Sequence, residues 1–216
     1  MKGERMVLAL AMCGGLTVLP GSAQAAEFTP TAAGWVGEAE LTVGGRQVHA
    51  APIAPCETGG TLSNESRGTK VGSSTEYGRG TSTCARNSDG TATALVTGQR
   101  FETRVLEQFG GPAIKVRTYS ARCDTTQSGS RGSVELGNAE GITVPSSIPA
   151  NYTQTIPGRA AGDPPMATVV INELITPSPP DGSLSTNAMR IKLFPEGGPA
   201  EGEIVLGAAT CDPYGD

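Results

Sequence analysis

The sequence predicts an all-β fold, a sandwich or barrel of short antiparallel strands stapled by two disulfides. Several segments alternate apolar and polar residues with a period of two, which is the pattern of half-buried strands. The 216-residue chain contains 30 Gly and 16 Pro, a density that favours short strands and turns over long helices. After the apolar leader, an even number of cysteines remains to be paired.

The first 25 residues predict a secretory signal peptide. Lys2 and Arg5 form a short basic head, residues 6–19 are apolar, and residues 23–25 read Ala-Gln-Ala, the small-x-small pattern of a cleavage site. We therefore expect cleavage after Ala25 and a single secreted β domain over residues 26–216.

The first strands are expected at residues 35–43 and 46–54, joined by a Gly-Gly hairpin turn. In the first, Trp35 should share a face with Ala39 and Leu41, while Glu38 and Glu40 should lie on the other.

Residues 58–90 are rich in Gly, Ser and Thr. They predict a long, irregular polar loop within the domain, pinned at its ends by Cys56 and Cys84. A stretch of this length without regular structure is either functional or merely tolerated.

Further strands are expected in the rest of the chain. Residues 113–123 should place Val116 and Thr118 on one face and Tyr119 on the other. Residues 100–108 are compatible with a helical turn or a hairpin. The other expected strands cover residues 91–96, 133–136, 141–144, 166–175, 184–194 and 203–211.

Four cysteines remain once Cys13 leaves with the leader, where Met12 makes a poor lipidation signal: Cys56, Cys84, Cys123 and Cys211. They allow three pairings. We favour Cys56–Cys84 and Cys123–Cys211, because the first two flank one polar segment and the last two each end a strand. Two disulfides indicate an oxidising compartment. The chain has no C-x-x-C pattern and a single His, so we expect no zinc site and no cofactor.

The charge pattern bears on partners. The net charge is −5 and no basic run occurs, which disfavours nucleic acid and anionic lipid. No apolar stretch after the leader is long enough to span a membrane. The partner is therefore expected outside the cell or in its envelope, and its identity is open.

The sequence gives little support for a catalytic function. His49 is the only His, and neither G-x-S-x-G nor S-x-x-K occurs, so a hydrolytic triad is disfavoured. Glu38 and Glu40 have the residue type of a glycosidase pair but fit a solvent-facing strand better. Residues 87–90 and 181–182 predict turns rather than calcium sites.

Asn151, Asn172, Glu173 and Asn187 form the most suggestive polar set, because three of them interrupt apolar strands. Buried polar groups must be hydrogen-bonded. The set predicts a buried network that fixes the strand register; a ligand pocket between strands is the alternative.

The segments Asn172-Glu173, Asn187-Ala188-Met189-Arg190 and Glu203–Leu206 carry a likeness to a known family. Over roughly residues 113–212 the chain resembles the actinobacterial choice-of-anchor P surface proteins. The resemblance implies an exported β domain of unassigned role. Members are tethered by varied C-terminal signals; the chain shows none, which favours free secretion and leaves surface association open.

These observations favour a non-catalytic, secreted extracellular or envelope-associated β module that is structural or binds a ligand. Its expected contact surface is the segment 58–90. The alternative is a secreted hydrolase or an inhibitor-like binding protein.

Overall fold

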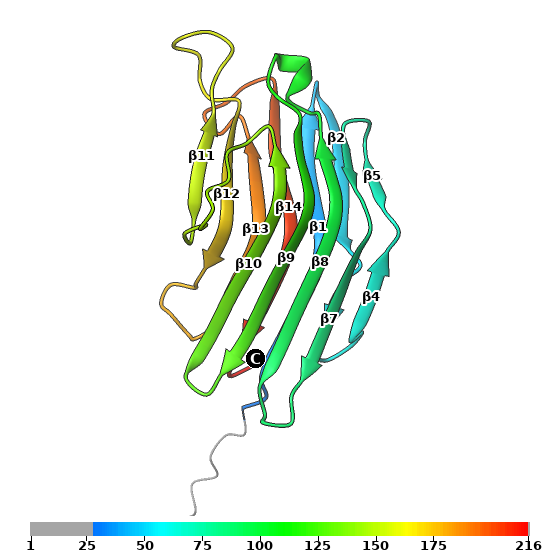
Figure 1. The fold of residues 1–216 in the computed structure, drawn as a ribbon, viewed down its shortest axis with the longest axis vertical. Coiled ribbons are helices and arrows are strands. Elements are labelled where there is room, and N and C mark those ends of the chain that lie inside the picture. The colour runs from blue at the N-terminus through cyan, green and yellow to red at the C-terminus, as the bar shows by residue number, and fades with distance from the viewer. Residues whose placement is uncertain (1–27, 216) are drawn as a thin grey trace, which may run out of the picture.

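Two antiparallel sheets pack face to face in the computed structural model, which describes residues 28–215 (Figure 1). The expected all-β class is confirmed, and the architecture is a sandwich rather than a closed barrel. The expected signal peptide, its cleavage site and Cys13 lie outside the described residues.

Sheet A contains seven strands in the order β11-β12-β13-β14-β1-β2, with β3 also pairing with β1. Its centre is the pair of β1 and β14, which come from opposite ends of the chain. The strands are β1 (Thr31–Val43), β2 (Arg46–Ile53), β3 (Cys56–Glu57), β11 (Tyr152–Ile156), β12 (Ala167–Ile175), β13 (Leu184–Leu193) and β14 (Ala200–Asp212).

Sheet B also contains seven strands, in the order β10-β9-β8-β6-β5; β7 pairs with β8, and β4 pairs with β7. A short 3-10 turn, η1 (Glu107–Phe109), follows β8 where the sequence left a helical turn or a hairpin open. The strands are β4 (Ser63–Ser66), β5 (Thr69–Val71), β6 (Thr75–Tyr77), β7 (Gly80–Arg86), β8 (Ala92–Thr103), β9 (Ile114–Thr126) and β10 (Gly129–Glu140).

The expectation of an irregular loop at residues 58–90 is wrong, because β4, β5, β6 and β7 lie inside it. In β7, Ser82 and Cys84 are buried while Thr81 and Thr83 are exposed. The alternation of buried and exposed residues is therefore present, but small polar residues occupy many of its positions. A search for alternating apolar residues does not find it. Pairing of β7 with β8 supplies the backbone hydrogen bonds.

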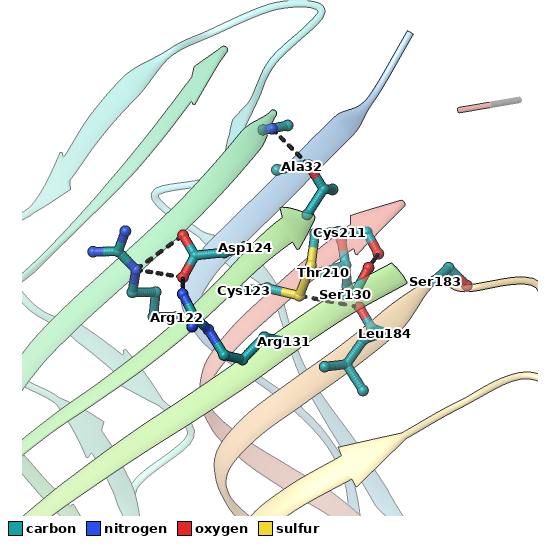
Figure 2. Close-up of a disulfide and its surroundings, with 12 residues drawn as sticks. Ala32, Arg122, Cys123, Asp124, Ser130, Arg131, Ser183, Leu184, Thr210 and Cys211 are labelled. Atoms are coloured by element: carbon teal, nitrogen blue, oxygen red, sulfur yellow. Dashed lines mark hydrogen bonds and ion pairs between the residues drawn. A yellow bond between two sulfur atoms is a disulfide. The ribbon is translucent and has the colours of Figure 1, made fainter. Parts of the chain in front are cut away.

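Both disulfides join one sheet to the other, with the expected pairing. Cys56 on β3 bonds to Cys84 on β7, and Cys123 on β9 bonds to Cys211 on β14 (Figure 2). The bridges close chain separations of 28 and 88 residues. The sandwich is thus covalently fixed at two places.

A line across both sheets, here called the crease, inverts the alternation of inward and outward side chains. In β1, Ala32, Gly34 and Val36 are buried, and then Gly37, Ala39 and Leu41. Because each long strand inverts at the same level, the pairing register is kept. The crease passes through Val36, Gly207, Ala188 and Asn172 in sheet A and through Arg100, Arg117 and Asn138 in sheet B.

Two predictions about which side chains face the core are wrong because of the crease. Trp35 lies opposite to the inward set of Ala39 and Leu41, and Thr118 is exposed while Tyr119 is buried. Left-handed backbone marks the crease: φ is 53° at Asn172, 55° at Gly207, 58° at Arg100 and 46° at Asn138. A strict period of two cannot continue through such positions, so the alternation restarts with the opposite phase.

Two tyrosines of sheet B reach across the core to the crease of sheet A. The Tyr77 hydroxyl donates to the Glu38 carbonyl at 2.6 Å, and the Tyr119 hydroxyl donates to the Val36 carbonyl at 3.0 Å. Gly37 and Gly98 leave room for the two rings, since a side chain at either would meet the ring. Burial raises the pKa of both hydroxyls, so both stay protonated donors.

Candidate functional site

Asn151 and Asn172 form a backbone clip between the start of β11 and strand β12. The Asn151 N–H donates to the Asn172 carbonyl, and the Asn151 Oδ1 accepts from the Leu174 N–H, both at 2.8 Å. The Asn172 amide donates to the Ile148 carbonyl at 3.2 Å. Both asparagines have positive φ, which asparagine tolerates better than most residues. Their bonds hold local backbone in place.

Glu173 and Asn187 belong to a second group, on the outer face of sheet A. The Glu173 carboxylate accepts from the Asn187 amide at 2.6 Å and from Arg190 Nε at 2.9 Å. Arg190 also donates to Glu203 at 3.0 Å. The structure thus divides the four predicted residues into two groups. Sequence reasoning missed the role of Arg190 and Glu203, although cross-strand opposite charges were a usable signal.

The residues considered for catalysis do not gather around a nucleophile. His49 is exposed on β2, opposite Glu40 of β1. Within residues 28–215 no hydrogen bond joins His49 to a serine or a carboxylate. Glu40 in turn lies opposite Glu203 of β14. This arrangement is a charged outer face of a sheet.

The two candidate calcium segments are turns, as expected. Asp89 Oδ1 accepts from the Thr91 N–H at 3.0 Å, and Asp181 Oδ1 accepts from the Ser183 N–H at 2.8 Å. Hydrogen bonds from Thr91 and Ser183 lower the pKa of these carboxyls. In the described part of the chain, no group of three His, Cys, Asp or Glu side chains could hold a metal ion.

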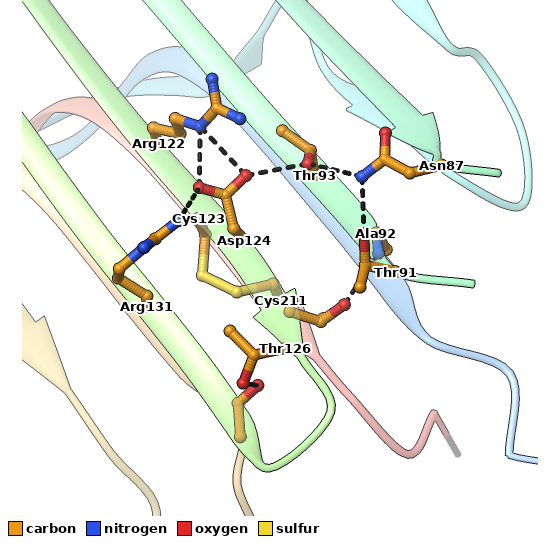
Figure 3. A network of polar contacts seen from close by, with 12 residues as sticks. Asn87, Thr91, Ala92, Thr93, Arg122, Cys123, Asp124, Thr126, Arg131 and Cys211 are labelled. Carbon is orange, nitrogen blue, oxygen red and sulfur yellow. Dashed lines mark hydrogen bonds and ion pairs between the residues drawn. A yellow bond between two sulfur atoms is a disulfide. The ribbon is translucent and has the colours of Figure 1, made fainter. Parts of the chain in front are cut away.

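A polar network surrounds Asp124, next to the Cys123–Cys211 bridge (Figure 3). Asp124 accepts from Arg122 Nε at 2.7 Å and from the Thr93 hydroxyl at 2.8 Å. Burial alone would raise the pKa of Asp124, but these hydrogen bonds outweigh it and lower the pKa. The network joins β8 to β9 and extends to Asn87 in the β7–β8 turn. The polar groups of this network are hydrogen-bonded to one another, so we interpret the network as structural.

A groove of about 920 Å³ crosses the outer face of sheet B, and the sequence did not predict it. Gly80 and Gly98 contribute backbone atoms to its lining, while a side chain at either position would point into the core, toward Val36 or Tyr119. Thr81, Thr97 and Ser120 stand side by side on β7, β8 and β9. Glu65 and Arg67 lie at one end and Glu135 at the other. The groove spans β4 to β10, which is about 19 Å for strands about 4.8 Å apart.

The groove combines hydroxyl groups with charged ends on a rigid support. The Thr81 and Thr97 hydroxyls share a hydrogen bond at 2.9 Å and remain exposed to solvent. Residues 65–67 and 79–81 of the lining come from the segment that the sequence singled out as a contact surface. That segment therefore lines the groove as strands rather than as a free loop.

Comparison with protein-family models, curated proteins and solved structures finds no match to this chain. Within residues 28–215 no helix has the length and apolar character needed to cross a membrane.

Proposed function

We propose that this chain is a secreted, non-catalytic binding module of the extracellular space or cell envelope, and that the groove on sheet B is its contact surface. One observation carries the proposal: hydroxyl side chains line a groove built on five neighbouring strands. A site on strands is held more firmly than one on loops. The two inter-sheet disulfides add to that rigidity.

Secretion is part of the proposal. The apolar leader and its Ala-Gln-Ala pattern support cleavage after Ala25. Two disulfides fit an oxidising compartment. The resemblance to choice-of-anchor P surface proteins supports the same location. The intact mass of the exported protein should begin at Ala26 and lack four hydrogens; a mass that begins at a lipidated Cys13 would contradict it.

The groove favours a hydrophilic, extended ligand. Ligand sites commonly measure about 300–1,000 Å³, and this one lies at the upper end. Threonine and serine hydroxyls both donate and accept, which suits a partner rich in hydroxyl or amide groups. A glycan chain of the envelope has this chemistry.

Binding to isolated cell envelopes of the host tests the proposal. Residues 26–216 with intact disulfides should co-sediment with the envelopes. Ser120→Trp should abolish sedimentation by filling the groove, whereas Ser185→Trp, on β13 of the other sheet, should not. Loss of binding in both variants, or in neither, would overturn the assignment of the groove.

A further inference from the structure

Arg79 lines the groove just before β7, and Arg100 and Arg117 lie at the crease of sheet B, next to the lining residues Gln99 and Thr118. We propose that Arg79, Arg100 and Arg117 form an anion-binding row, and that the ligand of the groove is an anionic polysaccharide. The inference rests on the proposed function, because it names the ligand class of the same groove.

Arg100 and Arg117 stand level with each other on neighbouring strands. The pairs Gln99–Thr118 and Phe101–Val116 flank them in the β8–β9 register. Both arginines are exposed. Like charges directly opposite each other destabilise a sheet. The repulsion between Arg100 and Arg117 is not offset by a salt bridge to a carboxylate within the described residues.

Arg100 also has a left-handed backbone, with φ at 58°. This conformation is unfavourable for a residue with a Cβ. At the other left-handed crease positions the chain has Asn138, Asn172 and Gly207, the residue types that adopt it most readily. An arginine at the fourth position is locally unfavourable, and such positions cluster at functional sites.

The row has no carboxylate partner. Six other Lys and Arg side chains form salt bridges, whereas no salt bridge within residues 28–215 involves Arg79, Arg100 or Arg117. This holds in a chain whose net charge is −5. Arg79 lines the groove, and its carbonyl accepts from the Gln99 N–H at 2.9 Å, beside Arg100. Five other Lys and Arg side chains of residues 28–215 also form no salt bridge, but Arg79, Arg100 and Arg117 are the three that lie at one level of neighbouring chain segments beside the groove.

Hydroxyl groups and arginines together define the ligand chemistry. A guanidinium forms paired hydrogen bonds with a carboxylate or a phosphate. The hydroxyls of Thr81, Thr97 and Ser120 match the hydroxyl groups of sugars. A polysaccharide with uronate or phosphodiester groups satisfies both halves of the site, with its anionic groups at the arginine row and away from Glu65 and Glu135 at the two ends of the groove.

Calorimetric titration of disulfide-intact residues 26–216 tests the inference with polygalacturonate, poly(glycerol phosphate) and neutral dextran. We expect binding to at least one anionic polymer, weakened by salt, and none to dextran. The polymer that binds distinguishes carboxylate from phosphate. The double variant Arg100→Asn with Arg117→Gln should bind at least tenfold more weakly and keep or raise its unfolding midpoint.

The matched control is Arg46→Gln with Arg86→Gln, which removes two exposed arginines that also form no salt bridge with any residue of the described range. Equal weakening by the control, equal binding of double-stranded DNA, or a large loss of stability in the Arg100/Arg117 variant would overturn the inference. Envelope binding that depends on Ser120 but not on Arg100 and Arg117 would overturn it while leaving the proposed function intact. Loss of envelope binding in wild type would remove both.

Discussion

The Tyr77 hydroxyl shows how much one atom can hold in this sandwich. It lies beneath the crease, 2.6 Å from the Glu38 carbonyl and 3.1 Å from the Val205 carbonyl. These carbonyls belong to β1 and β14, the two central strands of sheet A. A buried carbonyl without a donor is costly, so the side chain of one sheet stabilises the backbone of the other.

Tyr77→Phe should lower the free energy of unfolding by about 1–3 kcal/mol, because it removes the donor and keeps the ring. The measurement is denaturant unfolding with both disulfides intact. Tyr152→Phe is the matched control, since Tyr152 is half-buried on the edge strand β11. Equal effects of the two substitutions would contradict the role given to Tyr77.

Strand β10 shows what the crease demands of an element. Asn138 is exposed with φ at 46°, and it lies level with Arg117 of β9. The conformation, rather than any buried contact, selects the residue there.

Asn138→Gly should leave stability within about 0.5 kcal/mol of wild type, whereas Asn138→Val should lower it by about 1–2 kcal/mol. Thermal unfolding of the two variants checks this. A valine variant as stable as the glycine variant would show that the crease is not held in the left-handed conformation.

The two disulfides act between elements and differ in the chain length that they close. Replacing Cys123 and Cys211 with Ala should lower the free energy of unfolding by about 4.5 kcal/mol, and replacing Cys56 and Cys84 should lower it by about 3.5 kcal/mol. The difference arises because a disulfide that closes a longer loop restricts the unfolded chain more. The separations are 88 and 28 residues. Denaturant unfolding of both double variants gives the order, and the reverse order would show that local strain or packing dominates.

The sequence predicts elements well wherever apolar residues mark the alternation, as in β1, β12, β13 and β14. It fails at β4 to β7, because Ser and Thr occupy both faces there, and at Trp35 and Tyr119, because the crease inverts the phase. The disulfide pairing followed from chain position alone. The groove could not be predicted, since Thr81, Thr97, Ser120 and Glu135 meet only through the strand pairing.

The whole molecule should lose stability in alkali. Burial holds the pKa of Tyr77 and Tyr119 above the ordinary value of about 10, so the unfolded chain releases these protons first. The folded state then binds more protons than the unfolded state, and the free energy of unfolding falls as pH rises above 10.

For two such groups the slope is close to zero at pH 8 and approaches roughly 2.7 kcal/mol per pH unit by about pH 11. Urea unfolding between pH 8 and pH 11 measures it, and Tyr119→Phe should halve the slope. A flat profile would show that the hydroxyls are not withheld from solvent.

The central pair of sheet A sets the order in which the chain can mature. Thr31 of β1 lies opposite Asp212 of β14, so the middle of that sheet is empty until the last strand arrives. Cys123 likewise waits for Cys211. Sheet A and the Cys123–Cys211 bridge therefore cannot be completed until nearly the whole chain is available, whereas the strands of sheet B all lie between residues 63 and 140 and can pair earlier. The native topology thus makes sheet A the last part of the sandwich that can be completed.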